Sequence, residues 1–241
     1  MRYLDLTLPT IAENLALDEA LLIAADERGA GAALRIWEPT SLAVVLGASG
    51  RWREDVQVEL CHADGVVIAR RSSGGGTVVI GPGTLNITVV LPIDAAPGLG
   101  AVDRAQQYVL ERVASQLRSQ GSAVEVLGQG DLTIDARKFS GSAQRRLRHH
   151  FLVHATILYD FPLELVTRYT HLPRRQPAYR AGRSHEDFLV NLDLPRERLI
   201  DAVRRAWLED RQSSELIEIP RDLMEDLITE KFSDPAWIER L

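Results

Sequence analysis

Residues 70–77 read Arg-Arg-Ser-Ser-Gly-Gly-Gly-Thr and follow a short apolar segment, 66–70, that is typical of a β-strand. Three glycines after a strand let backbone N–H groups approach a ligand closely and point together at an anion. The arginines add planar, permanently charged groups that suit phosphate or carboxylate. The stretch therefore indicates either an anion-binding loop or a plain glycine turn between two strands.

A second stretch, residues 131–143, reads Asp-Leu-Thr-Ile-Asp-Ala-Arg-Lys-Phe-Ser-Gly-Ser-Ala. The whole chain has only two lysines, Lys138 and Lys231, against twenty-six arginines. Lysine carries a compact point charge that fits among phosphate and carbonyl oxygens. A lysine in a chain that otherwise uses arginine predicts a specific role for Lys138; a surface lysine in a hairpin is the alternative. Gly141 and Ala143 would leave room beside the ammonium group for a ligand.

Around these stretches the pattern predicts a helix followed by many strands. Thr10 and Glu13 have capping-box spacing, which predicts a helix that begins there and ends at Gly29. Residues 85–91 alternate in the way typical of a half-buried strand, and a second helix is predicted over 102–120. Further strands are predicted at 34–37, 42–46, 66–70, 124–127, 132–134, 138–144 and 151–158.

The C-terminal part, 193–241, is predicted to be helical, with Pro195 and Pro220 in the first turns of helices. The resulting order is a helix, strands with an inserted helix, and then helices. Because it lacks a regular strand–helix alternation, this order predicts an α+β fold. No Pro/Gly/Ser-rich linker or repeat divides the chain, so residues 1–241 are expected to form one domain.

Composition excludes several classes of protein. The single cysteine, Cys61, excludes an intrachain disulfide and a Cys-rich zinc site. No run approaches the ~18 apolar residues that span a bilayer, and Asp5 stands where a signal peptide would be apolar, so we expect a cytoplasmic protein without membrane contact. The net charge of −6 argues against a generic nucleic-acid binder. The arginines of 137–150 and 168–183 nevertheless suit a phosphate-bearing ligand or an acidic partner.

Other motifs fall at a fixed spacing from these two stretches. The Arg-Arg-Ser-Ser-Gly-Gly-Gly-Thr run is followed about sixty residues on by Lys138-x-x-Gly141-x-Ala143, and then by His154. In this order and spacing, the chain resembles the lipoate–protein ligase family from about residue 4 to 192. Further positions fit the pattern: Asn14, Asp18, Glu19, and residues 35–39, 83–86 and 182–188.

The resemblance implies the biotin/lipoate-ligase catalytic fold, a mixed or antiparallel sheet flanked by helices. It also implies a lipoate–protein ligase with two half-reactions. ATP and lipoate or octanoate would give an acyl-adenylate and pyrophosphate, and a lysine of a lipoyl-domain protein would then take the acyl group. Mg²⁺ would accompany ATP, and an acidic surface of the acceptor would dock on the basic segment 137–150.

Roles for single residues follow from the resemblance by position. Lys138 would be catalytic and would stabilise charge on carbonyl and phosphate oxygens, and Asp131 would help to hold the metal. The ligand-binding residues would be Arg70, Arg71, Ser73, Gly74, Gly75, Gly76, Thr77, Val78, Asn86, Lys138, Gly141, Ser142, Ala143 and His154. An apolar slot for the acyl tail is expected from Val78, Val79, Ile87 and Val89.

Two positions depart from the better-known ligases. Ile80-Gly81 stands where His-Asp is common, and Ala155-Thr156 follows His154 where Gly-Thr is common. Both changes bear on the acyl-chain preference and the rate. The chain also lacks a clear accessory domain of the kind that the longer ligases carry. This leaves open a separate accessory subunit, or a substrate that arrives already activated.

Other functions remain as alternatives. An octanoyl- or lipoyl-transferase on the same fold uses a cysteine nucleophile, but Cys61 lies in a segment that reads as helical and is expected to be structural. A biotin ligase would interleave glycine and arginine in its loop. The intact Lys138 motif disfavours a non-catalytic lipoate- or lipoyl-domain-binding protein. The acidic net charge and the lack of aromatic residues interleaved with 145–148 disfavour a nucleic-acid binder.

Overall fold

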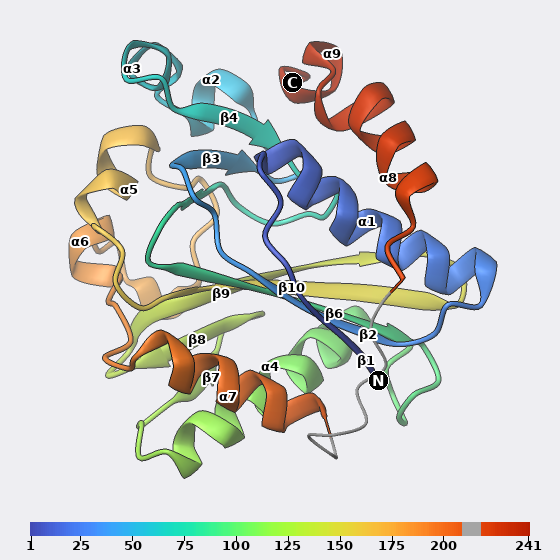
Figure 1. Cartoon of the computed structure of the whole chain (residues 1–241). Helices are drawn as coiled ribbons and strands as arrows, with labels where there is room; N and C mark the ends of the chain where they lie inside the picture. Colours follow the sequence, from blue (N-terminus) through green and yellow to red (C-terminus); the bar gives the residue numbers. More distant parts are fainter. Residues whose placement is uncertain (209–217) are drawn as a thin grey trace.

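Figure 1 shows the computed structural model of the chain, which describes residues 1–208 and 218–241. Its centre is a seven-stranded sheet in which β1 runs parallel to β2 and all other neighbours are antiparallel. In spatial order the strands are β1 (Arg2–Asp5), β2 (Ala33–Trp37), β6 (Thr84–Pro92), β10 (His150–Leu158), β9 (Arg137–Arg146), β8 (Asp131–Ile134) and β7 (Glu125–Leu127). The predicted α+β fold with a mixed sheet is confirmed.

A smaller sheet of three strands holds the glycine-rich stretch. Its strands are, in spatial order, β4 (Val67–Arg70), β3 (Ala43–Leu46) and β5 (Val78–Ile80). The stretch Arg71–Thr77 connects β4 to β5 and therefore forms a loop between two strands, as predicted. Figure 1 shows this sheet beside α1, above the large sheet.

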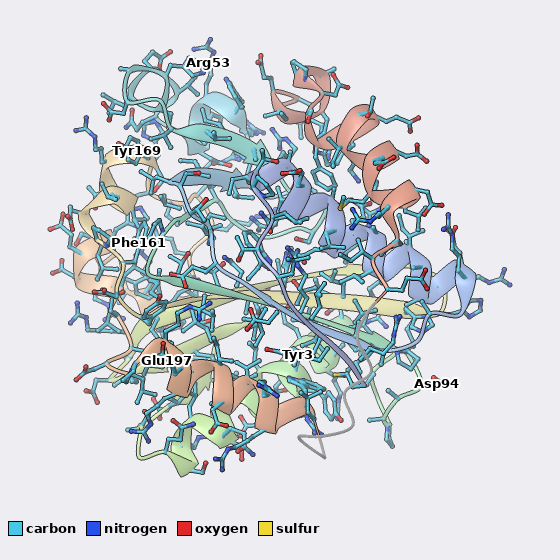
Figure 2. All side chains as sticks on the ribbon, viewed as in Figure 1. Tyr3, Arg53, Asp94, Phe161, Tyr169 and Glu197 are labelled. Atoms are coloured by element: carbon cyan, nitrogen blue, oxygen red, sulfur yellow. The ribbon has the colours of Figure 1, made fainter. Side chains whose placement is uncertain are left out.

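Helices cover both faces of the large sheet (Figure 1). The helices α4 (Val102–Ser119) and α7 (Arg196–Trp207) pack on one face, and α1 (Ile11–Arg28) and α8 (Arg221–Leu227) lie on the other. Figure 2 shows side chains filling both layers. The shorter helical segments are α2 (Trp52–Asp55), α3 (Val58–Ala63), α5 (Glu164–Tyr169), η1 (Ala178–Arg180), α6 (His185–Phe188), η2 (Ile228–Phe232) and α9 (Pro235–Ile238). No helix of the described residues is long and apolar enough to cross a membrane.

The first helix has the boundaries that its capping residues predict. The Thr10 hydroxyl accepts a hydrogen bond from the backbone N–H of Glu13, and the Glu13 carboxylate accepts one from the backbone N–H of Thr10. At the other end Gly29 takes the left-handed conformation with φ 68°. The α1 helix is therefore fixed at both ends, and it covers the face of the sheet that carries the site.

The burial of β6 differs from the sequence prediction of a half-buried strand. Leu85, Ile87 and Val89 pack toward α4, as the alternation indicates. Thr88 and Val90, on the opposite face, are also buried, because α1 covers that face. A central strand covered on both sides buries both sets of residues, so the polar Thr88 marks a covered site rather than a solvent-exposed face.

Of the C-terminal part predicted to be helical, 193–241, residues 209–217 lie outside the described residues. The described remainder contains helices, but its two prolines stand one position earlier than expected. Pro195 is the N-cap of α7 and Pro220 is the N-cap of α8. After α8 the chain continues through η2 and α9 and returns to β4, where the Trp237 indole N–H donates to the Arg70 carbonyl at 2.9 Å. The last residues of the chain therefore lie beside the glycine-rich loop.

Candidate functional site

Two rows of side chains cross the large sheet on the face that α1 covers. In the first row Trp37, Asn86, Thr156, Gly141 and Asp131 stand opposite one another on β2, β6, β10, β9 and β8. Residues directly opposite each other in a ladder point to the same face. The first row therefore forms a continuous floor across five strands, although its members are far apart in the sequence.

The second row lies beside the first and contains Arg35, Thr88, His154 and Ala143. The Arg35 guanidinium is fully buried and donates to Asp18 of α1 at 2.6 Å. Burial acts to raise the pKa of Asp18, but Arg35 and His154 outweigh it and hold that pKa below its usual value. This ion pair fastens α1 to the floor of the site.

A pocket of about 650 Å³, part of which opens to solvent, lies over the first row and between α1 and the small sheet. Its lining includes many of the residues predicted to bind ligand: Arg71, Gly76, Thr77, Val78, Asn86, Lys138, Gly141, Ser142, Ala143 and His154. The sequence prediction missed these lining residues: Leu15, Asp18, Trp37, Val45, Ile80, Ala155 and Thr156. Asp18 and Trp37 belong to the positions that fit the family pattern in the sequence, and that resemblance could have assigned them to the site.

The apolar slot is built from different residues than expected. Val78 lines the pocket, together with Leu15, Trp37, Val45 and Ile80. Three other predicted members do not line it, because Ile87 and Val89 face α4 and Val79 packs among the residues around the small sheet. The slot therefore lies between α1, the small sheet and the first row.

Lys138 reaches the pocket because of an irregularity in β9. Leu132 pairs with Ser140 and Thr133 pairs with Lys138, so Phe139 is an extra residue in the ladder. The bulge turns Lys138 to the same face as Gly141. A side chain at Gly141 would place its Cβ 2.6 Å from the Lys138 Nζ. Glycine at that position is what allows the lysine to lie across the strand into the pocket.

Asp131 holds the Lys138 ammonium group, and Tyr179 in turn holds Asp131. The Lys138 Nζ lies 2.7 Å from one carboxylate oxygen of Asp131, and the other oxygen accepts a hydrogen bond of 2.7 Å from the Tyr179 hydroxyl. Burial and the neighbouring Asp131 raise the pKa of Tyr179, so its hydroxyl stays protonated and continues to donate. The Lys138 side chain is 27% exposed, which leaves the cation accessible from the pocket.

The same contacts bear on the magnesium role predicted for Asp131, which the structure leaves as a prediction. Both of its carboxylate oxygens are already engaged, one by Lys138 and one by Tyr179. Within residues 1–208 and 218–241, no group of three or more His, Cys, Asp or Glu side chains could hold a metal ion. Magnesium therefore stays a prediction from the resemblance and has no site built by these residues alone.

Arg71 holds the glycine-rich loop from beneath. Its buried guanidinium donates to the carbonyls of Val45, Gly74 and Gly76 and to the Ser73 hydroxyl, at 2.5–3.2 Å. Burial lowers the pKa of Arg71 to about 10, so the group is still charged at neutral pH. An arginine that binds only carbonyl and hydroxyl oxygens keeps its positive charge uncompensated at the loop.

Arg70 is placed differently from the prediction, outside the pocket lining. Its fully buried guanidinium donates to the carbonyls of Gly47, Gly50, Ile238 and Arg240, at 2.6–3.0 Å. These carbonyls belong to the turn after β3 and to the C-terminal end of the chain. Four of the five guanidinium N–H groups are therefore used to tie the C-terminal residues to the small sheet.

The exposed part of the loop is Gly74–Gly76, of which Gly76 lines the pocket. Ser73, predicted to contact ligand, is instead buried, with its Oγ 2.6 Å from Nε2 of His154. Burial lowers the pKa of His154, and Arg71 lowers it further, so the ring is neutral at pH 7. His154 thus lines the pocket and also anchors the start of the loop; its predicted contact with an acyl chain stays a prediction.

The basic segment 137–150 is not one free surface. Arg137 donates to the carbonyls of Glu186 and Leu189, Arg146 donates to the carbonyl of Leu99, and Arg145 pairs with Glu19. Docking of an acidic acceptor on this segment stays a prediction, and Arg148 and His149 are its exposed basic residues.

Cys61 lies on α3, fully buried among the apolar residues of the small sheet and outside the pocket lining. Burial raises the pKa of its thiol to about 11. A nucleophilic cysteine needs a thiolate within reach of the acyl carbon, and Cys61 meets neither condition. The expectation of a structural cysteine is confirmed.

Comparison with known proteins shows the family to which the chain belongs. The lipoyl protein ligase A/B catalytic domain matches residues 10–210, so the chain belongs to this enzyme family. The lipoate-protein ligase LplJ of Bacillus subtilis is 26% identical over 153 residues, which are 64% of this chain and 44% of that protein. The octanoyl-[GcvH]:protein N-octanoyltransferase of Geobacillus kaustophilus is 30% identical over 146 residues, 56% of this chain and 50% of that protein. The chain spans about half the length of the curated relatives it matches.

Solved structures show the same fold. A lipoate-protein ligase A bound with ATP has a TM-score of 0.84 and 23% identity, and the alignment covers 100% of this chain and 99% of that one. The bi-partite lipoate protein ligase of Thermoplasma acidophilum has a TM-score of 0.82 and 23% identity, with 99% of this chain and 95% of that one covered. At this identity the likeness establishes the fold.

Proposed function

We propose that this chain is a lipoate–protein ligase that joins lipoate or octanoate to AMP and then transfers the acyl group to a lysine of a lipoyl domain. The observation that carries the proposal is the position of Lys138 at one end of an apolar-lined pocket, beside the glycine-rich loop. Strands lie about 4.8 Å apart, so the floor from Gly141 across to Trp37 is roughly 14 Å long. An extended eight-carbon acyl chain fits along it, with its carboxylate near Lys138.

In the first half-reaction an oxygen of the acid attacks the α-phosphorus of ATP, and the bond to the pyrophosphate oxygen breaks. The products are the acyl-adenylate and pyrophosphate. The Lys138 ammonium would neutralise charge on the carboxylate and phosphate oxygens, which approach each other in the transition state. The glycines would let the loop backbone lie close to the phosphate.

In the second half-reaction the uncharged amine of the acceptor lysine attacks the acyl carbonyl, and the carbon–oxygen bond to AMP breaks. AMP leaves, an amide forms and the amine loses its proton to solvent. Lys138 would again stabilise the oxygen that gains negative charge. The partly buried, neutral His154 would line the acyl pocket and keep the loop in place in both steps.

Two relatives define the alternatives and the partners to be tested. The Geobacillus relative is an octanoyltransferase, and a transferase would move an acyl group between proteins without ATP. The Thermoplasma relative is bi-partite and was studied with its E2 lipoyl domain. A lipoyl-domain acceptor and a separate accessory polypeptide are accordingly part of the proposal.

The test is transfer to a purified lipoyl domain, followed by intact-protein mass spectrometry. We expect the mass of one lipoyl or octanoyl group to appear on the acceptor when the chain, ATP and the free acid are present, and not when ATP is left out. Preformed acyl-adenylate should replace ATP and acid together. Transfer from an octanoylated donor protein without ATP would instead establish a transferase and overturn the ligase.

A further inference from the structure

Three cations gather beside the glycine-rich loop, where the C-terminal residues meet β9 and α1. We call Arg145 of β9, Lys231 of η2 and Arg240 the C-terminal cation cluster. The Lys231 ammonium nitrogen lies 4.6 Å and the Arg240 guanidinium carbon 3.5 Å from the centre of the Trp237 ring. Lys231 and Arg240 lie beyond residues 10–210, which match the family.

The cluster carries more positive than negative charge. Within the described chain its one ion-pair partner is Glu19, which lies 2.6 Å from Arg145 and 2.8 Å from Lys231. Arg240 donates to the carbonyl of Ala48, and its buried Nε has no partner among the described residues. Burial lowers the pKa of Lys231, and the charges of Arg145 and Arg240 lower it further, while Glu19 opposes them. One carboxylate therefore serves three cations.

The cations lie above the carboxylate, toward solvent. The Glu19 side chain is only 2% exposed, whereas Arg145 is 27% and Lys231 17% exposed. A buried acid beneath partly exposed bases holds the bases in place and leaves part of each basic side chain in contact with solvent. This is an arrangement in which a second, larger anion can bind from solvent.

The cluster is joined to the loop by short contacts. Trp237 donates to the Arg70 carbonyl, and the Arg240 partner, Ala48, donates its own N–H to the Ser73 carbonyl at 2.8 Å. Arg145 follows Ala143 by two residues on β9 and so points to the same face. A Cβ at Gly75 would lie 3.6 Å from the Ala143 Cβ. The cluster therefore borders the loop on the α1 side.

The loop presents free donors next to these cations. Gly74, Gly75 and Gly76 are exposed, and none of their backbone N–H groups donates to an acceptor within residues 1–208 and 218–241. Arg71, under the loop, binds only uncharged oxygens. Free N–H groups close to uncompensated cations favour an anion with several charges.

We infer that the C-terminal cation cluster binds the pyrophosphate part of a nucleoside triphosphate and, after adenylation, the released pyrophosphate. The inference rests on the proposed function for its role in the reaction, because the pyrophosphate bond breaks in the first half-reaction. Arg145, Lys231 and Arg240 neutralise the negative charge that the leaving group gains. The second half-reaction has no pyrophosphate, so it does not need the cluster.

Direct binding of inorganic pyrophosphate to the full chain, measured by titration calorimetry without acid or acceptor, tests the inference. Lys231→Ala and Arg240→Ala should each raise the dissociation constant about tenfold, since each removes a charge-assisted contact. Lys231→Arg should keep most of the affinity. Arg28→Ala is the matched control, because Arg28 of α1 pairs with exposed Asp222 of α8 and with no member of the cluster, and it should leave binding unchanged.

The Glu19→Gln variant distinguishes two roles of the cluster. The cluster either binds an anion or acts as a clasp, meaning a set of ion pairs that only fastens the C-terminal residues to α1. In an anion site Glu19 competes with pyrophosphate for Arg145 and Lys231, so its neutralisation should tighten binding severalfold, provided that thermal unfolding shows a folded variant. A clasp predicts that Glu19→Gln and Lys231→Ala both lower the unfolding temperature and leave pyrophosphate binding unchanged. That result, or a wild-type chain that does not bind pyrophosphate, overturns the inference.

The two proposals fail separately. A chain that adenylates the acid, but whose Lys231→Ala variant binds pyrophosphate like wild type, overturns the cluster and keeps the ligase. A chain without adenylation that binds pyrophosphate with the predicted pattern of variants keeps the anion site and overturns the ligase.

Discussion

Lys138 is positioned by residues from three separate parts of the chain. The bulge in β9 turns it toward the pocket, Gly141 gives it room, and Asp131 with Tyr179 fixes its ammonium group. A side chain held in this way loses little freedom when a ligand binds. At the scale of single residues, the site therefore depends on the Lys138 ammonium group being held at one fixed position in the pocket.

We predict that Lys138→Ala lowers the rate of acyl-adenylate formation by at least about 100-fold, as the loss of a charge-stabilising group does in other enzymes. Lys138→Arg should not restore it, because the bulky planar guanidinium does not fit the space above Gly141. Single-turnover formation of the adenylate measures both. A folded Lys138→Ala chain with wild-type rates would remove Lys138 from the mechanism.

For Cys61 we predict that substitution leaves the activity intact, unlike substitution of Lys138. Cys61→Ser should keep its activity, and the native thiol should react with iodoacetamide far more slowly than the unfolded one. Because its pKa is raised to about 11 from 9.0, burial of the neutral thiol stabilises the fold below pH 9, and this contribution is lost as the pH rises toward 11. The stability of Cys61→Ser should fall less over that interval than that of wild type, as denaturant titrations can measure. A folded but inactive Cys61→Ser would favour the transferase.

At the scale of elements, the glycine-rich loop depends on the conformation of one glycine. Gly75 has φ 85°, and a Cβ there would lie 2.9 Å from an Arg71 guanidinium nitrogen. A Cβ at Gly74 meets nothing within 4 Å. Gly75→Ala should therefore lower the free energy of unfolding by about 1–2 kcal/mol, and Gly74→Ala should change it little. Equal effects in ligand-free denaturant titrations would contradict this account of the loop.

The elements that could be predicted from the sequence are those with local signals. The capping residues Thr10 and Gly29 set the limits of α1 correctly, and the isolated Lys138 stood out in a chain that uses arginine. The burial of β6 was wrong because the sequence of a strand does not reveal that helices cover both its faces. Arg70 was misplaced for a similar reason, since its acceptors at Ile238 and Arg240 are 168 and 170 residues away.

The floor of the pocket could not be derived from local pattern either. Trp37, Asn86 and Thr156 become neighbours only through the register of three strands. A one-residue shift in any ladder would turn one of them to the opposite face. Alternation within β2 places Arg35 and Trp37 on one face, but it cannot say which strand lies beside them.

At the scale of the whole molecule, the net charge is −6, yet positive charge is concentrated around the glycine-rich loop and forms a positive centre there. Arg70 and Arg71 bind carbonyl and hydroxyl oxygens, and the C-terminal cation cluster shares the single carboxylate of Glu19. The C-terminal residues close this centre by returning to β4 (Figure 1). A centre of this kind, beside an apolar-lined pocket, suits the joining of an acid to a nucleotide.

Acid-dependent exchange of labelled pyrophosphate into ATP, with no acceptor protein present, tests the central claim most directly. The account predicts exchange with lipoate or octanoate, none without an acid, and none in folded Lys138→Ala. Absence of acid-dependent exchange by the folded wild-type chain would contradict it.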